Sequence, residues 1–259
     1  MNEEYSIITG ASSGIGLEFA NQLANRGQNI VLVARRKNEL EEISKNIIEK
    51  YKVKTIILVC DLSKIQEIRR AEKEIAKLKK IDFLVNCAGF GNKVMYSEMD
   101  SQKIEDMIQV HVMATTILTR AILPEMIKRN TGHIINISSI ASFITSSKSN
   151  AIYNSTKAYE RTFTENIIDE LKLKAPRVHA QALCPGLTRT PFFKNYDASY
   201  APKFMWMDAR EVVTKSIKQV IKKSTVFIPG WKNKFIVLLL KGALTKKIIN
   251  YFGRRLNIK

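Results

Sequence analysis

The sequence predicts an α/β fold: one doubly wound parallel sheet covered by helices on both faces, in a single domain that carries a C-terminal helical extension. Short apolar runs rich in β-branched residues alternate with longer segments whose apolar residues recur every three or four positions. Alternating strands and helices are typical of right-handed βαβ units, which build parallel sheets. A length of 259 residues with 45% hydrophobic residues is enough for one such domain with a full core.

Seven apolar runs are the predicted strands: 5–9, 29–34, 54–60, 81–86, 132–138, 177–184 and 225–228. Six amphipathic segments are the predicted helices: 15–26, 39–51, 65–78, 104–128, 151–173 and 208–222. Ligands of such sheets bind beyond the carboxyl ends of the strands, so we expect the chemistry in the loops that follow them. No linker-like composition divides the chain, and we expect residues 1–230 to form the ligand-binding and catalytic domain and 231–259 the extension.

The chain is strongly basic, with 42 Lys and Arg against 24 Asp and Glu and a formal net charge of +18. Such a charge can serve a nucleic acid, an anionic membrane or a phosphorylated ligand. Part of it can equally be solvated lysine on helix faces, because the chain is rich in Lys, Ile and Asn. No nucleic-acid-binding motif accompanies the charge, so we expect no nucleic-acid partner.

The cysteines indicate a reducing compartment. Cys60, Cys87 and Cys184 are too few and too scattered for a disulfide framework, and none belongs to a metal-binding pattern. The first ten residues reach a glycine motif and contain two acids, which is unlike a signal peptide. We therefore expect a cytoplasmic protein without a metal site.

A glycine-rich turn follows the first predicted strand and leads into the first helix. It reads Gly10, Ala11, Ser12, Ser13, Gly14, Ile15 and Gly16. The glycines permit a tight turn, and the helix N-terminus offers unpaired N–H groups and a positive dipole to a pyrophosphate. The GxxxGxG spacing resembles the short-chain dehydrogenase/reductase family, which implies a Rossmann fold, a nicotinamide cofactor and a homodimer or homotetramer.

The end of the second predicted strand bears on the choice of cofactor. An NAD site places Asp or Glu there to hold the ribose 2′-hydroxyl, whereas this chain has Ala34 followed by Arg35 and Arg36. Guanidinium groups supply charge-assisted hydrogen bonds to a 2′-phosphate, which predicts NADP(H). The competing interpretation is a solvated basic pair that starts a helix.

Two further strand ends complete the predicted cofactor cleft. Asp61, which precedes Leu62, could accept a hydrogen bond from the adenine amino group or could cap the next helix. The run Asn86, Cys87, Ala88 and Gly89 resembles the family's NNAG motif with Cys in the second position. Its small residues would let the backbone lie against the cofactor, and Cys87 is interpreted as a small buried hydrophobe.

Tyr153 and Lys157 are four residues apart on a predicted helix and so share one face. A phenol ionises near pH 10, and a neighbouring ammonium lowers its pKa by favouring the phenolate. Ser139 ends the fifth predicted strand fourteen residues before Tyr153. This set resembles the family's serine followed by YxxxK, which implies a substrate-binding serine, a proton-donating tyrosine and a lysine that also binds the nicotinamide ribose. Ser138 is the alternative serine.

The sixth predicted strand leads into a motif that resembles the family's PGxxxT, formed by Pro185, Gly186, Thr188 and Thr190. The resemblance implies that its backbone meets the nicotinamide carboxamide and that a threonine reaches the pyrophosphate. One position departs from the family, because His111 stands where a catalytic Asn is usual. His111 could hold the relay water through its ring, preserve the relay through its main-chain carbonyl, or be a structural histidine.

The segment 188–208 corresponds to the family's substrate lid and is dense in aromatic residues and methionine. This composition favours a bulky apolar ketone over a sugar, although some of these side chains could be core or dimer contacts. The sequence thus predicts an NADP(H)-dependent carbonyl reductase that interconverts a hydrophobic ketone, acyl, steroid-like or cyclic, and its secondary alcohol. The alternative is a catalytically weak NADP(H)-binding regulatory or scaffold protein, suggested by His111.

Residues 231–259 carry eight Lys or Arg and no acid. Their apolar run 235–240 is far shorter than the roughly 20 residues that span a bilayer. One helical stripe contains Val237, Leu240, Leu244, Ile248 and Tyr251. A basic amphipathic helix of this kind packs on its domain or on a partner subunit, or lies on an anionic membrane. We expect packing, with peripheral membrane contact through the basic face left open.

Overall fold

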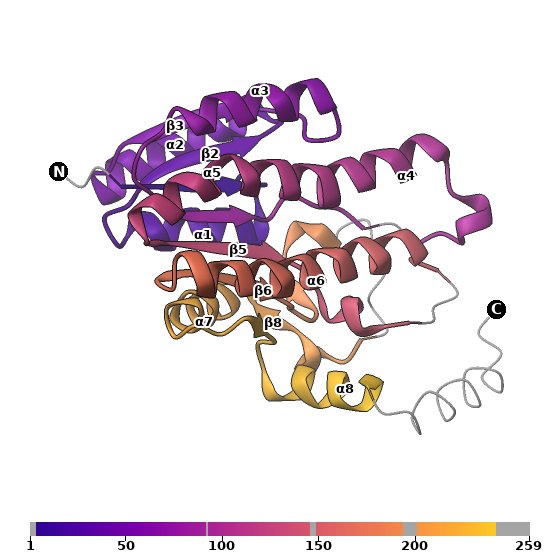
Figure 1. The fold of residues 1–259 in the computed structure, drawn as a ribbon. Coiled ribbons are helices and arrows are strands. Elements are labelled where there is room, and N and C mark those ends of the chain that lie inside the picture. The colour runs from indigo at the N-terminus through magenta and orange to yellow at the C-terminus, as the bar shows by residue number, and fades with distance from the viewer. Residues whose placement is uncertain (1–3, 92, 146–148, 194–200, 242–259) are drawn as a thin grey trace, which may run out of the picture.

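The computed structural model describes residues 4–91, 93–145, 149–193 and 201–241 (Figure 1). Seven parallel strands form one sheet in the order β3-β2-β1-β4-β5-β6-β9, which confirms the doubly wound architecture. The strands of this sheet are β1 (Tyr5–Thr9), β2 (Asn29–Ala34), β3 (Thr55–Val59), β4 (Ile81–Asn86), β5 (Gly132–Ile137), β6 (Val178–Leu183) and β9 (Val226–Phe227). A separate parallel pair is formed by β7 (Thr188–Arg189) and β8 (Met207–Asp208).

Helices cover both faces of the large sheet. They are α1 (Gly14–Ala24), α2 (Lys37–Tyr51), α3 (Ile65–Ala76), α4 (Ser101–Ile108), α5 (Thr115–Arg129), α6 (Ala151–Lys174), α7 (Ala209–Ile221) and α8 (Trp231–Lys241). Short 3-10 turns are η1 (Tyr96–Glu98), η3 (Ile140–Phe143), η4 (Pro191–Phe193) and η5 (Lys203–Met205). The strands and helices predicted from periodicity are therefore present, with ends that differ by a few residues.

Period-two alternation divides the strand residues between two cores. On one face Ile7 and Leu84 pack with buried side chains of α3, α5 and α6. On the other face Ile8 and Val85 pack with buried side chains of α1, α2 and α7. Because both faces are covered, the strands are nearly continuous apolar runs, as is typical of buried parallel sheets.

The predicted helix 104–128 is interrupted. A π-helical turn, η2 (Gln109–Ala114), lies between α4 and α5 and contains the buried His111. By length and composition, the stretch Ser101–Arg129 could cross a membrane, but half of its most apolar window is buried inside the fold. Burial of this kind is expected of a core helix in a two-sided α/β sheet.

The C-terminal extension contacts the domain through α8. Val237 is buried against Phe143 of η3 and against Ala182 and Cys184 at the end of β6, and Leu240 packs on the same cluster. The predicted packing of the extension is thus seen over α8. The rest of the predicted stripe, Leu244, Ile248 and Tyr251, lies outside the described residues.

Candidate active site

The carboxyl ends of β1 and β4 are joined by one threonine hydroxyl. Thr9 Oγ1 accepts hydrogen bonds from the backbone N–H groups of Cys87 (2.9 Å) and Ala88 (3.0 Å). Gly10 follows with φ +66°, and a Cβ there would lie 2.9 Å from Cα of Ala88. The glycine turn and the Asn86–Gly89 segment are therefore in backbone contact, as the cofactor prediction requires.

The glycine turn fits a dinucleotide pyrophosphate. Gly14 has φ +57°, and a Cβ on Gly16 would collide with the carbonyl oxygen of Gly10. Ser13 occupies the N-cap of α1 but makes no side-chain capping bond, so the first N–H groups of the helix face outward. N–H groups at a helix N-terminus that no side chain caps, reached by a turn that only glycine fits, are what a bound phosphate needs.

Arg36 lies against the same turn. Its guanidinium donates to Ser12 Oγ at 2.8 Å and forms an ion pair with Glu39 at 3.4 Å. Arg35, the neighbouring residue, is exposed. Arg36 and Ser12 thus present donors side by side where the predicted 2′-phosphate would lie, whereas nothing in the structure fixes the Arg35 side chain.

Asp61 closes a turn just before α3 but does not cap that helix, which has no side-chain capping bond, so one of its two predicted roles is not seen. Its Oδ1 accepts from the backbone N–H of Ser63 at 3.0 Å and from the Ser63 hydroxyl at 2.9 Å, just before α3. Leu62 is buried between them. The contact of Asp61 with adenine stays a prediction.

A buried amide network fixes the ends of β4 and β5. Asn86 Nδ2 donates to Asn136 Oδ1 (2.8 Å) and to Thr119 Oγ1 (3.1 Å), and Asn136 Nδ2 donates to Thr164 Oγ1 (2.9 Å). Since buried amides are costly unless paired, this network holds α5 and α6 at a set position relative to the sheet. Cys87 lies beside it, and burial raises the pKa of its thiol to about 12, which agrees with a small hydrophobe and not a nucleophile.

Tyr153 and Lys157 share the face of α6 that points at the end of β5. Lys157 Nζ lies 5.8 Å from the centroid of the Tyr153 ring. Burial raises the pKa of Tyr153, while Lys157 and a hydrogen bond with the Ser139 side chain lower it. The expected effect of the lysine is present, but desolvation outweighs it, so the phenol keeps its proton at neutral pH.

The structure separates the two candidate serines. Ser138 is buried, and its hydroxyl donates to the backbone carbonyl of Lys157 at 2.7 Å. Ser139 bonds with the Tyr153 phenol, and its Oγ accepts from the N–H of Ala141 at 3.1 Å. Ser138 therefore anchors α6 to β5, and Ser139 is the serine beside the phenol.

Glu160 is a site residue that the sequence analysis did not single out. Its carboxylate lies against Lys157 Nζ, with Oε2 at 2.9 Å and Oε1 at 3.2 Å, and the same ammonium donates to the carbonyl of Ile137 at 2.8 Å. Both side chains are almost fully buried. The available signal was the (i, i+3) spacing of a carboxylate after the lysine, which places both on one helix face.

Burial disfavours the charged form of both Lys157 and Glu160. Burial alone would lower the pKa of Lys157, but Glu160 and then Tyr153 raise it, and three acceptor oxygens surround the ammonium. Burial raises the pKa of Glu160 to about 7, against the effect of Lys157. The lysine therefore stays charged, while the carboxyl beside it gains and loses its proton near neutral pH.

His111 is held by two hydrogen bonds. Its Nε2 accepts from the backbone N–H of Phe90 at 3.1 Å, and its Nδ1 lies 2.8 Å from Thr156 Oγ1, which in turn donates to the carbonyl of Tyr153. Because an N–H can only donate, Nε2 carries no proton and Nδ1–H donates to Thr156. Burial and then Lys157 lower the pKa of His111 well below its usual value, so the ring is neutral.

The PG motif lies between the residue after Ser139 and the glycine turn. The N–H of Ile140, next to Ser139, donates to the carbonyl of Pro185 at 3.0 Å. Thr188 Oγ1 donates to the carbonyl of Gly186 at 3.0 Å, and Thr190 packs on Gly14, where a Cβ would lie 3.2 Å from Thr190 Cβ. The predicted cofactor motifs are thus brought to one edge of the sheet.

Aromatic rings form a wall beside the phenol. The ring of Tyr153 lies 6.1 Å from that of Phe192, Phe192 lies 5.1 Å from Phe193, and Phe193 lies 4.9 Å from Trp206. The pairing of β7 with β8 brings the two ends of the predicted lid together. Residues 194–200 of the predicted lid lie outside the described residues.

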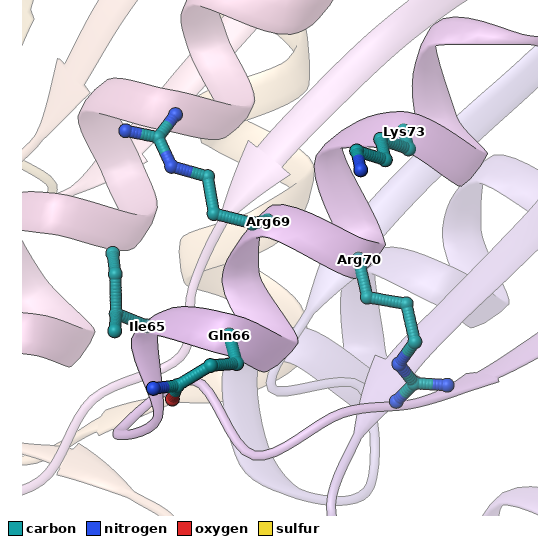
Figure 2. A pocket seen from close by; sticks show the side chains of 5 residues that line it. All are labelled: Ile65, Gln66, Arg69, Arg70 and Lys73. Atoms are coloured by element: carbon teal, nitrogen blue, oxygen red, sulfur yellow. The ribbon is translucent and has the colours of Figure 1, made fainter.

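A shallow hollow on the outside of α3 is unrelated to these motifs. Figure 2 shows the five side chains that line it: Ile65, Gln66, Arg69, Arg70 and Lys73. Arg69 is paired with Glu72 and Arg70 with Glu67. None of the predicted site residues contributes to this hollow, and its arginines already have carboxylate partners.

Comparison with known proteins agrees with the fold and the motifs. Residues 4–201 match the family model described as short chain dehydrogenase. An uncharacterized oxidoreductase of Staphylococcus saprophyticus is 32% identical over 220 residues, 85% of this chain and 93% of that protein. The chain therefore belongs to the short-chain dehydrogenase family.

Solved structures and a human relative add detail. A short-chain dehydrogenase from Sphingobium yanoikuyae in complex with NADPH is similar, with a TM-score of 0.82, 26% identity and coverage of 99% of this chain and 96% of that chain. A bulky-bulky ketone specific alcohol dehydrogenase from Comamonas testosteroni has a TM-score of 0.78 at 26% identity, covering 98% and 94%. Human inactive hydroxysteroid dehydrogenase-like protein 1 is 32% identical over 188 residues, 72% of this chain and 56% of that protein.

The neutral state of His111 predicts a pH-dependent stability. The unfolded chain takes up a proton at a histidine near pH 6.5, whereas folded His111 does not, so its contribution to the free energy of unfolding is lost as pH falls below about 6.5. Glu160, whose pKa is raised to about 7, has the opposite effect: its contribution to the free energy of unfolding grows as pH falls through the same range.

We expect His111→Gln to remove only the loss of stability that is due to the histidine. Between about pH 7 and pH 5.5 the wild type should lose about 1 kcal/mol relative to the variant, measured by urea unfolding. Parallel stability curves would show that His111 is not neutral in the fold.

Proposed function

We propose that this protein is an NADP(H)-dependent oxidoreductase that interconverts a hydrophobic ketone and its secondary alcohol. The observation that carries the proposal is the convergence of Ser139, Tyr153 and Lys157 at the end of β5, beside the glycine turn. A protonated phenol next to a fixed hydroxyl and a buried ammonium can donate a proton to a substrate oxygen bound beside the hydroxyl.

The proposed roles follow from these contacts. The nicotinamide, when bound, supplies the hydride for ketone reduction. Ser139 donates a hydrogen bond to the substrate carbonyl and polarises it, and Tyr153 Oη gives the oxygen a proton as negative charge develops there. Lys157 stabilises the resulting phenolate through its positive charge, and the family resemblance gives it the nicotinamide ribose as a second proposed partner.

Glu160 adjusts this proton transfer through charge. Its carboxylate raises the pKa of both Lys157 and Tyr153. A higher phenol pKa keeps Tyr153 protonated, which suits ketone reduction. Glu160 touches Lys157 and not the reacting atoms, so its role is to position and tune the lysine.

The cofactor preference is supported by Arg36 and Ser12. The Arg36 guanidinium donates to Ser12 Oγ at 2.8 Å beside the glycine turn, and β2 ends without an acid that would repel a 2′-phosphate. The relative from Sphingobium yanoikuyae was solved with NADPH. Gly10, Gly14 and Gly16 would hold the pyrophosphate, and the Asn86–Gly89 and Pro185–Thr190 segments would line the rest of the cleft.

The substrate class is supported by the ring contacts that run from Tyr153 to Trp206. An apolar wall next to the proton donor favours a substrate with a bulky apolar group over a sugar. The alcohol dehydrogenase from Comamonas testosteroni, whose substrates are named as bulky-bulky ketones, is a structural neighbour. Three free cysteines accord with the proposed cytoplasmic setting.

A catalytically weak NADP(H)-binding regulator or scaffold is the second candidate, because a human relative is named inactive. The intact contacts of Ser139, Tyr153 and Lys157 favour the enzyme. NADPH oxidation measured against a panel of hydrophobic ketones separates the two: binding of NADPH without turnover of any ketone would favour the regulator.

The tyrosine can be tested against a matched tyrosine on the same helix. Tyr153→Phe keeps the ring and removes the transferable proton, so turnover should fall by roughly 10²-fold to 10⁴-fold while NADPH still binds. Tyr159→Phe is the control, because the Tyr159 hydroxyl bonds with Thr116 on the other side of α6. The assay follows NADPH absorbance with a reactive ketone. Normal turnover by Tyr153→Phe would contradict the mechanism.

The cofactor preference predicts a selective loss of affinity. Arg36→Ala removes a charged donor, so the dissociation constant for NADPH should rise by about ten-fold or more, on the scale of roughly 1.5 to 3 kcal/mol for a charged hydrogen bond, while that for NADH changes little. Arg35→Ala should show a similar selectivity if its exposed side chain also turns to the phosphate. Arg26→Ala, an exposed arginine beyond the end of α1, is the control. Equal losses for NADH and NADPH would mean that these arginines do not recognise the phosphate.

The charge of Glu160 predicts a shift in the pH profile. Glu160→Gln removes a negative charge that raises the pKa of Tyr153, so the alkaline limb of kcat/KM for ketone reduction should move to lower pH. Glu165→Gln, on the same helix but paired with Arg161 near the surface, should leave the profile unchanged. A fall in rate of equal size at every pH would assign Glu160 a purely structural role.

A further inference from the structure

The outer side of α8 is an exposed apolar face. Four of its large hydrophobic side chains are solvent-exposed: Trp231 (73%), Phe235 (55%), Leu238 (67%) and Leu239 (41%). Their spacing of three and four residues places them on one side of the helix. Exposed apolar surface gathered on one element of a folded domain indicates an interaction site.

The opposite side of α8 is firmly packed, which fixes the direction of the exposed face. Val237 is buried in the core at the end of β6. Asn233 Nδ2 donates to the carbonyl of Pro229 at 2.8 Å, and the Asn233 side chain fills the space beside Gly186. The helix therefore cannot rotate to bury its outer face without losing these contacts.

The apolar face continues onto the predicted lid. Phe204 of η5 is 65% exposed, and Lys232 Nζ lies 4.7 Å from the centroid of its ring and donates to its carbonyl oxygen at 3.3 Å. The same ammonium lies 5.5 Å from the Trp231 ring. Phe204 stands two residues before Trp206, which belongs to the aromatic wall of the candidate site.

The charged side chains that the structure describes along this face of α8 have one sign. Lys232 and Lys234 flank it, and residues 231–259 contain eight basic residues and no acidic one. A second copy of the chain docked on this face about a two-fold axis would bring like charges together, because a two-fold interface pairs a surface with itself. An anionic lipid surface is complementary to both the apolar face and the basic rim.

We propose that the outer face of α8, extended by Phe204, docks this protein on anionic membrane surfaces. The apolar run 235–240 is far shorter than the roughly 20 residues that span a bilayer, so in this proposal α8 lies in the headgroup region with its apolar side chains in the acyl boundary. In combination with the proposed function, on which this step rests, the docking places the aromatic lid next to the lipid. An apolar ketone dissolved in the bilayer then reaches Trp206 and Tyr153 along apolar surface.

Vesicle co-sedimentation of the full-length protein tests the docking without cofactor or substrate. Wild-type protein should bind vesicles of equal parts phosphatidylcholine and phosphatidylglycerol, bind pure phosphatidylcholine weakly, and be partly released by high salt. The double variant Phe235→Asp/Leu238→Asp should bind anionic vesicles about tenfold or more weakly, with its melting temperature and NADPH affinity unchanged. The control is Leu173→Asp at the end of α6, where Leu173 is 87% exposed and remote from α8.

Three outcomes would overturn the docking: no wild-type binding to anionic vesicles, equal loss of binding in the Leu173→Asp control, or unchanged binding by the double variant. Size-exclusion chromatography with light scattering adds a further check. If the wild type is a dimer that ignores vesicles and the double variant is a monomer, the face joins two copies and the membrane proposal is wrong. These measurements stand whether or not any ketone is reduced, so failure of the proposed enzyme activity is scored separately.

Discussion

The buried ammonium of Lys157 is the constraint around which the site is organised. A charge removed from water has to be offset locally, and here the carbonyl of Ile137 and the carboxylate of Glu160 do so. These partners come from the end of β5 and from α6 itself, so the ammonium fixes the helix against the strand. Its field then acts on every titratable neighbour: it lowers the pKa of Tyr153 and His111 and opposes the rise for Glu160. One desolvated charge thereby links the local packing to the proton chemistry.

The π-helical turn around His111 follows from the same requirement. A second cation close to Lys157 would be repelled, and the site avoids this by keeping His111 neutral with both ring nitrogens engaged. Thr156, the partner of the His111 ring, donates a hydrogen bond to the carbonyl of Tyr153, so the histidine supports the backbone that carries the phenol. Of the roles that the sequence left open, the ring contacts agree with a structural one, since both ring nitrogens bond to protein groups, while a relay through the main-chain carbonyl of His111 stays a prediction. A π-helical turn is a common accommodation at functional sites, because the extra residue re-aims side chains without ending the helix.

The sequence predicted well whatever depends on local pattern. Alternation of apolar residues fixes which face of β1 carries Ile7 and which carries Ile8, and the glycines of the first turn are required by backbone geometry that no other residue tolerates easily. It predicted less well whatever depends on neighbours distant in the chain. The bond of Ser138 to the Lys157 carbonyl, the bridge from Thr9 to Cys87 and Ala88, and the exposure of the outer face of α8 arise from tertiary packing. Glu160 lies between these cases, because its spacing from the lysine is local but its burial is not.

Packing also couples regions that carry different functions. Asn233 of α8 fills the space beside Gly186, the residue expected to meet the nicotinamide, and the amide cannot move without opening that contact. Lys232, the preceding residue, holds Phe204, and Trp206 lies two positions further along the lid against Phe193. A displacement of α8 therefore reaches the nicotinamide end of the cofactor cleft through Asn233 and the aromatic wall through Lys232. Because both contacts lie on a single helical turn, any partner that holds α8 in place also holds Asn233 beside Gly186 and Lys232 against Phe204.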